Sequence, residues 1–139
     1  MTILRCSASI SLIVALLSGC AAQIDPALEK QRQLQVQRMQ TRVFDTNDRN
    51  AVVRGIVAAM QDLNFVINKV DVEQGIVTAK RFGTYPIEMT VTVQSISGKQ
   101  ILVHDIAQYN LKPIEDPFLY EQFFSSLQKF TPQISPAGN

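Results

Sequence analysis

Strict alternation of apolar and polar residues between positions 87 and 94 constrains the fold of this chain most. The apolar positions are Ile87, Met89, Val91 and Val93, and the positions between them are Glu88, Thr90, Thr92 and Gln94. Because successive side chains of a strand point to opposite faces, the pattern predicts a strand with one face on a core and the other wet. Ser97 and Gly98 supply a turn, and a paired strand from Gln100 to about Tyr109 completes a hairpin.

Two helices are predicted, one before and one after the main run of strands. Asp45 and Asp48 resemble a helix N-terminus, and apolar residues recur at intervals of three and four from about Asn47 to Leu63. The second helix begins at Asp116, where a capping residue precedes a proline that needs no backbone donor. Its apolar face comprises Tyr120, Phe123, Phe124 and Leu127.

Further strands are predicted at Thr41 to Phe44, from Phe65 after a left-handed Asn64, and at Ile76 to Arg81. The order β-α-β-β-β-β-α predicts an α+β fold, a small antiparallel sheet with two helices on one face. A chain of 139 residues has room for one such domain. We expect the domain to span residues 41–131, followed by a disordered tail over 132–139.

The first 22 residues have the layout of a secretory signal peptide, with Arg5, an apolar run from Ile10 to Leu17 and then small residues. The run is shorter than the roughly 20 residues that span a bilayer. Leu17, Ser18, Gly19 and Cys20 resemble the lipobox of bacterial lipoproteins. This resemblance implies that residues 1–19 are removed and that Cys20 is acylated. Under the alternative, ordinary signal peptidase cleavage, Cys20 is an incidental thiol.

The lipoprotein resemblance also implies a location. Ala21 and Ala22 follow Cys20, and the lack of an Asp directly after the Cys favours the outer membrane, with the domain facing the periplasm. Two or three acyl chains anchor a protein stably, whereas one chain does so only weakly. Cys6 leaves with the signal peptide and Cys20 carries lipid, so no disulfide is expected.

Residues 20–40 are expected to be a lipidated Cys and a Gln-rich tether. Six Gln residues lie between Gln23 and Gln40, and no apolar stripe there is wide enough to seed a core. The alternatives are a solvated linker, a partly helical tether after Pro26, and a coiled-coil contact. The apolar residues available for a coiled coil are Leu28, Leu34, Val36 and Met39.

The layout of residues 41–130 resembles one repeat of the BamC family of barrel-assembly accessory lipoproteins. The shared features are the element order and the segment LNFVINKVDVEQGIVTAKR, in which a strand follows Asn-Phe after a helix. The resemblance implies an assembly role at the outer membrane.

Few residues suit catalysis or metal binding. His104 is the single His, and Asp105 beside it points to the opposite face of a strand, so the two cannot act as base and orienting acid. Zinc ligands are lacking, and the acids at helix starts are explained by capping. We therefore expect no enzyme activity, cofactor or metal. Thirteen Lys and Arg balance twelve Asp and Glu, which argues against nucleic acid as a partner.

Aromatic residues concentrate near the C-terminus, where six of the ten lie between Tyr109 and Phe130. Some are expected to be exposed and to anchor a partner or ligand; the alternative is that they all pack in the core. The loop from Asn110 to Pro117 beside the last helix is a second contact candidate. The candidate contact residues are Phe118, Tyr120, Phe123, Phe124, Tyr109 and Pro113.

Two functions remain open. The favoured one is a non-catalytic accessory or structural subunit of a cell-envelope complex for barrel assembly, secretion or efflux. The alternative is a periplasmic lipoprotein that binds a small apolar ligand or lipid. A carrier needs an apolar cavity under the helix that bears Phe123 and Phe124, whereas a docking subunit needs a filled core and an outward apolar patch.

Overall fold

The structure is a computed structural model that describes residues 25–132. Its elements are α1 (Pro26–Gln40), β1 (Thr41–Phe44), α2 (Arg49–Asp62), β2 (Val66–Asp71), β3 (Ile76–Arg81), β4 (Ile87–Ser97), β5 (Gln100–Tyr109), β6 (Lys112–Pro113) and α3 (Pro117–Phe130). The strands form one antiparallel sheet in the order β1-β5-β4-β3-β2, and β6 pairs with β5. The predicted α+β fold is confirmed. The proposed signal peptide, Cys20 and the tail after Pro132 lie outside the described residues.

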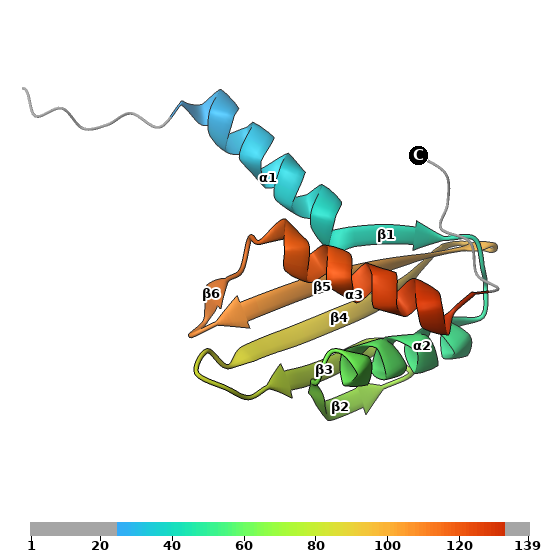
Figure 1. Ribbon diagram of the computed structural model, residues 1–139. Coiled ribbons are helices and arrows are strands. Elements are labelled where there is room, and N and C mark those ends of the chain that lie inside the picture. Colours follow the sequence, from blue (N-terminus) through green and yellow to red (C-terminus); the bar gives the residue numbers. More distant parts are fainter. Residues whose placement is uncertain (1–24, 133–139) are drawn as a thin grey trace, which may run out of the picture.

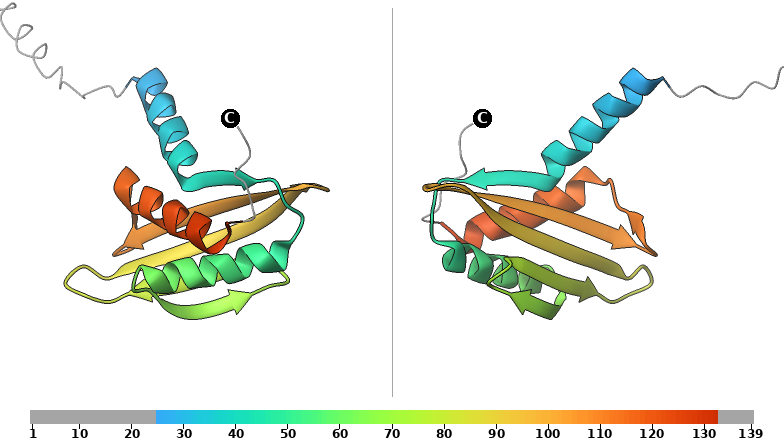
Figure 2. Two further views of the ribbon diagram at one scale, coloured as in Figure 1. Left: turned by 45° about the vertical axis from the view of Figure 1, so that its right-hand side comes forward. Right: turned by 180° about the vertical axis from the view of Figure 1, so that it is seen from behind.

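Helices α2 and α3 lie side by side over one face of the sheet (Figures 1 and 2). Their apolar faces and the inward residues of β3, β4 and β5 make one core. The largest of its fully buried side chains include Tyr120, Phe123, Ile56, Met60 and Met89. No helix among the described residues covers the other face, where Thr90, Thr92 and His104 are half-buried.

Local signals set the helix ends, as the sequence indicates. Asp48 caps α2 by accepting a hydrogen bond of 2.9 Å from the backbone N–H of Ala51, so the helix begins slightly after the expected Asn47. Asn64 follows α2 with a φ of 63°, the left-handed geometry predicted for the end of that helix. Asp116 caps α3 by accepting from the N–H of Phe118 at 3.0 Å.

The tether is a helix rather than a solvated linker. α1 leads straight into β1, and its last residue, Gln40, is buried against the domain. The observed order therefore has a helix before the predicted first strand, and a short sixth strand, β6, before α3. In Figure 1 the N-terminal end of α1 projects beyond the sheet and the two packed helices. Within the described residues, no helix is both long and apolar enough to cross a membrane.

Phe123 and Phe118 on α3 give a matched test of this packing. Phe123 is fully buried, whereas Phe118 is 63% exposed. We expect Phe123→Ala to lower the free energy of unfolding by about 3–5 kcal/mol, because it leaves a cavity between α3 and the sheet. Phe118→Ala should change it by less than about 0.5 kcal/mol. Urea unfolding followed by circular dichroism measures both, and equal losses would contradict this orientation of α3.

Candidate interaction site

The structure divides the six candidate contact residues into two groups. Tyr120, Phe123 and Phe124 are buried in the core, so the expectation that they offer a contact surface is corrected for these three. Their spacing of three and four places them on the face of α3 that the sheet covers. The other three remain outside the core: Phe118 and Pro113 are exposed, and Tyr109 is half-buried.

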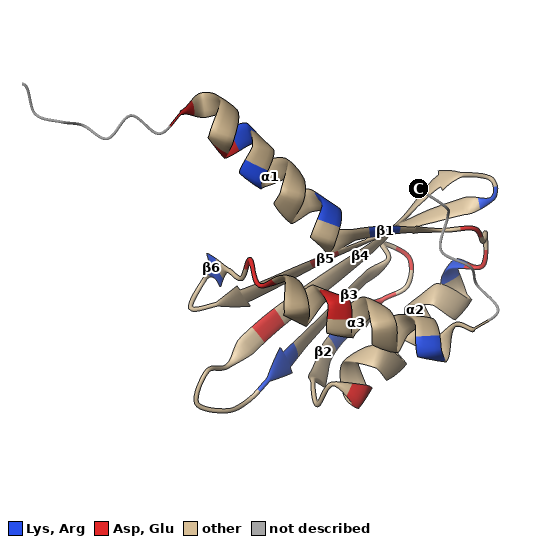
Figure 3. Cartoon of the chain, turned by 45° about the horizontal axis from the view of Figure 1, so that its top comes forward, with Lys and Arg blue, Asp and Glu red and all other residues tan. Residues whose placement is uncertain are grey.

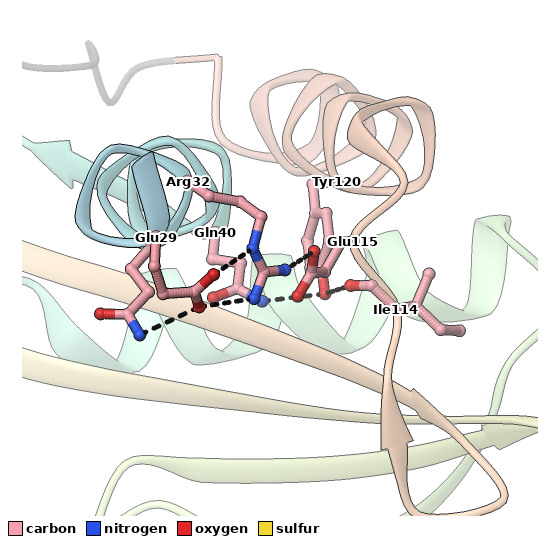
Figure 4. Close-up of polar contacts among 7 residues, drawn as sticks. Glu29, Arg32, Gln40, Ile114, Glu115 and Tyr120 are labelled. Carbon is pink, nitrogen blue, oxygen red and sulfur yellow. Dashed lines mark hydrogen bonds and ion pairs between the residues drawn. The ribbon is translucent and has the colours of Figure 1, made fainter. Parts of the chain in front are cut away.

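The hydroxyl of Tyr120 is the centre of a buried polar contact between distant segments (Figure 4). It donates to the carbonyl oxygen of Ile114 at 2.6 Å, and accepts from Gln40 Nε2 at 3.0 Å and from the N–H of Ala107 at 3.2 Å. The backbone N–H of Ile114 also donates a hydrogen bond of 2.9 Å to the carbonyl oxygen of Ala107. One side chain of α3 thereby holds the end of α1, β5 and the loop after β6 together.

Arg32 makes a second link between α1 and that loop. Its guanidinium pairs with Glu29 on α1 at 2.7 Å and with Glu115 before α3 at 2.5 Å (Figure 4). Hydrogen bonds with Arg32 lower the pKa of Glu29. All three side chains face solvent, where salt screens ion pairs and a single pair contributes little stability. The buried contact of Gln40 with Tyr120 therefore fixes α1 more firmly than the ion pairs do.

Asp105 is a buried carboxyl that the sequence analysis treated only as a neighbour of His104. It has no exposed area and lies on the helix-facing side of β5, with Val103 and Ala107. Neither carboxyl oxygen has a hydrogen-bond partner. Burial raises the pKa of Asp105 to about 8, because an apolar core disfavours the charged form.

His104 faces away from Asp105, as the alternation of strand side chains requires. Its Nδ1 lies 3.0 Å from Thr41 Oγ1, across the pairing of β5 with β1 on the uncovered face of the sheet. Among residues 25–132, no group of three or more His, Cys, Asp or Glu side chains could hold a metal ion. Lys and Arg are interspersed with Asp and Glu over the elements drawn in Figure 3.

An exposed apolar cluster that no sequence pattern predicted lies at one end of the sheet. Phe82 and Tyr85 lie in the loop between β3 and β4, and Leu111 lies in the turn between β5 and β6; all three are exposed. Antiparallel pairing brings this loop and this turn to the same end of the sheet. The sequence did contain a signal for this cluster. Phe82 and Tyr85 are large apolar residues on either side of Gly83 and Thr84, and their positions belong to no periodic pattern.

No protein-family model matches the chain, and a search of curated proteins finds no significant match.

Removal of the Tyr120 hydroxyl should weaken the attachment of α1. Tyr120→Phe keeps the ring but leaves Ile114, Ala107 and Gln40 without their partner, and we expect a loss of about 1–3 kcal/mol in unfolding free energy. Amide hydrogen exchange in the last turn of α1 should also become faster. Tyr85→Phe is the matched control, because Tyr85 is exposed, and should change neither quantity. Unchanged exchange in Tyr120→Phe would contradict the role of this hydroxyl.

Asp105 should make the fold less stable as pH rises. The unfolded chain releases this proton near the ordinary pKa of 3.8, whereas the folded protein keeps it until about pH 8. Between these values the unfolded state binds fewer protons, so each rise in pH favours unfolding, by at most about 1.4 kcal/mol per unit. Asp105→Asn should flatten this slope and stabilise the protein at pH 7, as measured by urea unfolding at several pH values.

The acids with lowered pKa act in the opposite direction and at lower pH. Glu29, Asp62 and Asp71 have lowered pKa values, so the stability they contribute is lost as pH falls through the acid range. A decline in stability between about pH 5 and 8 thus isolates Asp105, because the raised pKa of Tyr120 acts only at more alkaline pH. An identical decline in the wild type and in Asp105→Asn would show that another group causes it.

Proposed function

We propose that this protein is a lipid-anchored periplasmic lipoprotein of the outer membrane that acts as a non-catalytic accessory or structural subunit of a cell-envelope complex. The observation that carries the proposal is the filled core beneath α3, combined with apolar side chains left outside it. Tyr120, Phe123 and Leu127 have no exposed area, whereas Phe118 on the same helix is 63% exposed.

Phe118 supports a docking role by its surroundings. It borders a hollow of about 410 Å³ between α2 and α3, together with Leu63 and the polar side chains of Asp62 and Glu121. An exposed aromatic side chain beside a concave surface with a polar rim is typical of a protein contact. α1 is compatible with a docking role, because its buried attachment at Gln40 fixes the direction in which the helix leaves the domain.

The ligand-carrier alternative has less support. Phe124 borders an open groove between α3 and β1, where the guanidinium of Arg42 lies 5.0 Å from its ring centre. A larger hollow of about 610 Å³ lies between α2 and the end of α3, with Gly55, Phe130 and Thr131 on its border. Neither hollow is lined by Phe123, the residue that a cavity beneath α3 would expose.

Substitution of each of the two cysteines of the precursor tests the proposed anchor. Cys20→Ala should abolish labelling with radioactive palmitate and release the protein from the membrane fraction, because the thiol that accepts the lipid is gone. Cys6→Ala is the matched control, since this residue leaves with the signal peptide, and should change neither result. Membrane retention and acyl labelling of Cys20→Ala equal to those of the wild type would refute the anchor.

The docking role is tested by mild crosslinking in cells. The chain is tagged after Asn139, and the proteins that co-purify from solubilised membranes are identified by mass spectrometry. We expect a stoichiometric envelope complex that Phe118→Ser loses and Phe130→Ser retains, because Phe130 lies at the other end of α3. Recovery of the protein alone, with lipid in the extracted fraction, would favour the carrier.

A further inference from the structure

Three apolar side chains stand out at one end of the sheet, where the β3–β4 loop and the β5–β6 turn meet. Phe82 is 68% exposed, Tyr85 71% and Leu111 85%. We name them the tip surface. The rings of Tyr85 and Tyr109 pack edge to face with their centres 5.7 Å apart, which joins the loop to the end of β5. This ring contact holds Tyr85, one of the three residues, against the end of β5.

Leu111 occupies a backbone conformation that its side chain disfavours. Asn110 and Leu111 have φ values of 49° and 63°, and together they form the two-residue turn between Tyr109 and Lys112. A turn with two positive φ angles favours Asn followed by Gly, because a side chain at the second position is strained. A leucine at this position, with its side chain in solvent, contributes little to the fold, which favours a role in contacts outside the chain.

The chain between the domain and the proposed anchor is short. Arg32 on α1 pairs with Glu115, four residues after Leu111. From Arg32 the helix continues for about 10 Å to Asp25. The four residues between Asp25 and Cys20 allow the two Cα atoms to lie at most about 18 Å apart. The proposed anchor is therefore joined to the domain by a short helix and a short segment, which limits how far the domain can lie from the lipid surface.

The views of the fold show on which side α1 leaves the domain. In Figures 1 and 2 the N-terminal end of α1 rises away from the sheet and leans to the same side as β6 and the β3–β4 loop. The β4–β5 turn, which contains Lys99, lies at the opposite end. Lys112, the blue segment of β6 in Figure 3, follows Leu111 directly and is exposed.

We propose that the tip surface contacts the lipid surface to which Cys20 is anchored. This inference rests on the proposed lipoprotein function. Aromatic and aliphatic side chains that project from turns enter the boundary between headgroups and acyl chains, and a neighbouring lysine attracts anionic headgroups. The anchor supplies the affinity for the membrane, and the tip surface sets which end of the domain faces the lipid.

The test uses the mature protein, acylated at Cys20, in vesicles of phosphatidylethanolamine and phosphatidylglycerol. Acylation occupies the Cys20 thiol, so Leu111→Cys introduces a single site for a fluorescent probe. Lys99→Cys is the matched control at the other end of the sheet. Tyr85→Cys repeats the measurement outside the strained turn. Fluorescence is quenched either by nitroxide-labelled lipid or by iodide in the water.

We expect the probes at positions 111 and 85 to lose fluorescence with nitroxide-labelled lipid and to be shielded from iodide. The probe at position 99 should show the reverse. Anchored protein with iodide-accessible probes at all three positions would overturn the inference and leave the lipid anchor standing. Shielding that occurs only in native envelopes would identify a protein as the occupant instead. Failure of the acylated protein to associate with vesicles would refute both proposals.

Leu111→Gly separates this role from a structural one. Glycine adopts a positive φ without strain, so the midpoint of urea unfolding should rise. The probe at position 85 in this background should lose part of its shielding from iodide. A fall in the unfolding midpoint would show that Leu111 is kept for the fold, against the inference.

Discussion

The hydroxyl of Tyr120 is the contact on which the arrangement of this protein depends. A phenol in an apolar core needs hydrogen-bond partners, and here the partners come from α1, β5 and the loop before α3. The ring packs α3 against the sheet while the oxygen positions three other segments. The direction of α1 is consequently coupled to the packing of the core, although most of α1 lies in solvent.

Local patterns predicted the sheet well because each strand carries its own signal. The segments Thr41–Phe44, Ile76–Arg81 and Gln100–Tyr109 are observed with the predicted bounds, since β-branched residues and turn residues delimit them. The sequence did not decide whether the segment of α1 is a linker or a helix, because the sequence of a helix without an apolar stripe resembles that of a solvated segment. Its attachment depends on Gln40 and Tyr120, which no local window contains together.

The candidate site was predicted less well, for a related reason. Periodicity showed that Tyr120, Phe123 and Phe124 share a face of α3, but only the sheet determines that this face is buried. In β5 both faces carry apolar side chains, so the sequence could not show which face of the sheet Asp105 occupies. Phe82, Tyr85 and Leu111 lie in turns, where no period relates one residue to the next.

The direct junction of α1 with β1 has a mechanical consequence. With no linker between the helix and the strand, the number of residues in α1 sets the rotational phase of the domain about the helix axis. One inserted residue would turn the first residue of α1 by about 100° and move it by about 1.5 Å, whereas seven would nearly restore the original phase. Insertion of a whole pair of turns would therefore preserve the direction of the first residue of α1 relative to the domain, whereas a single-residue change would alter it.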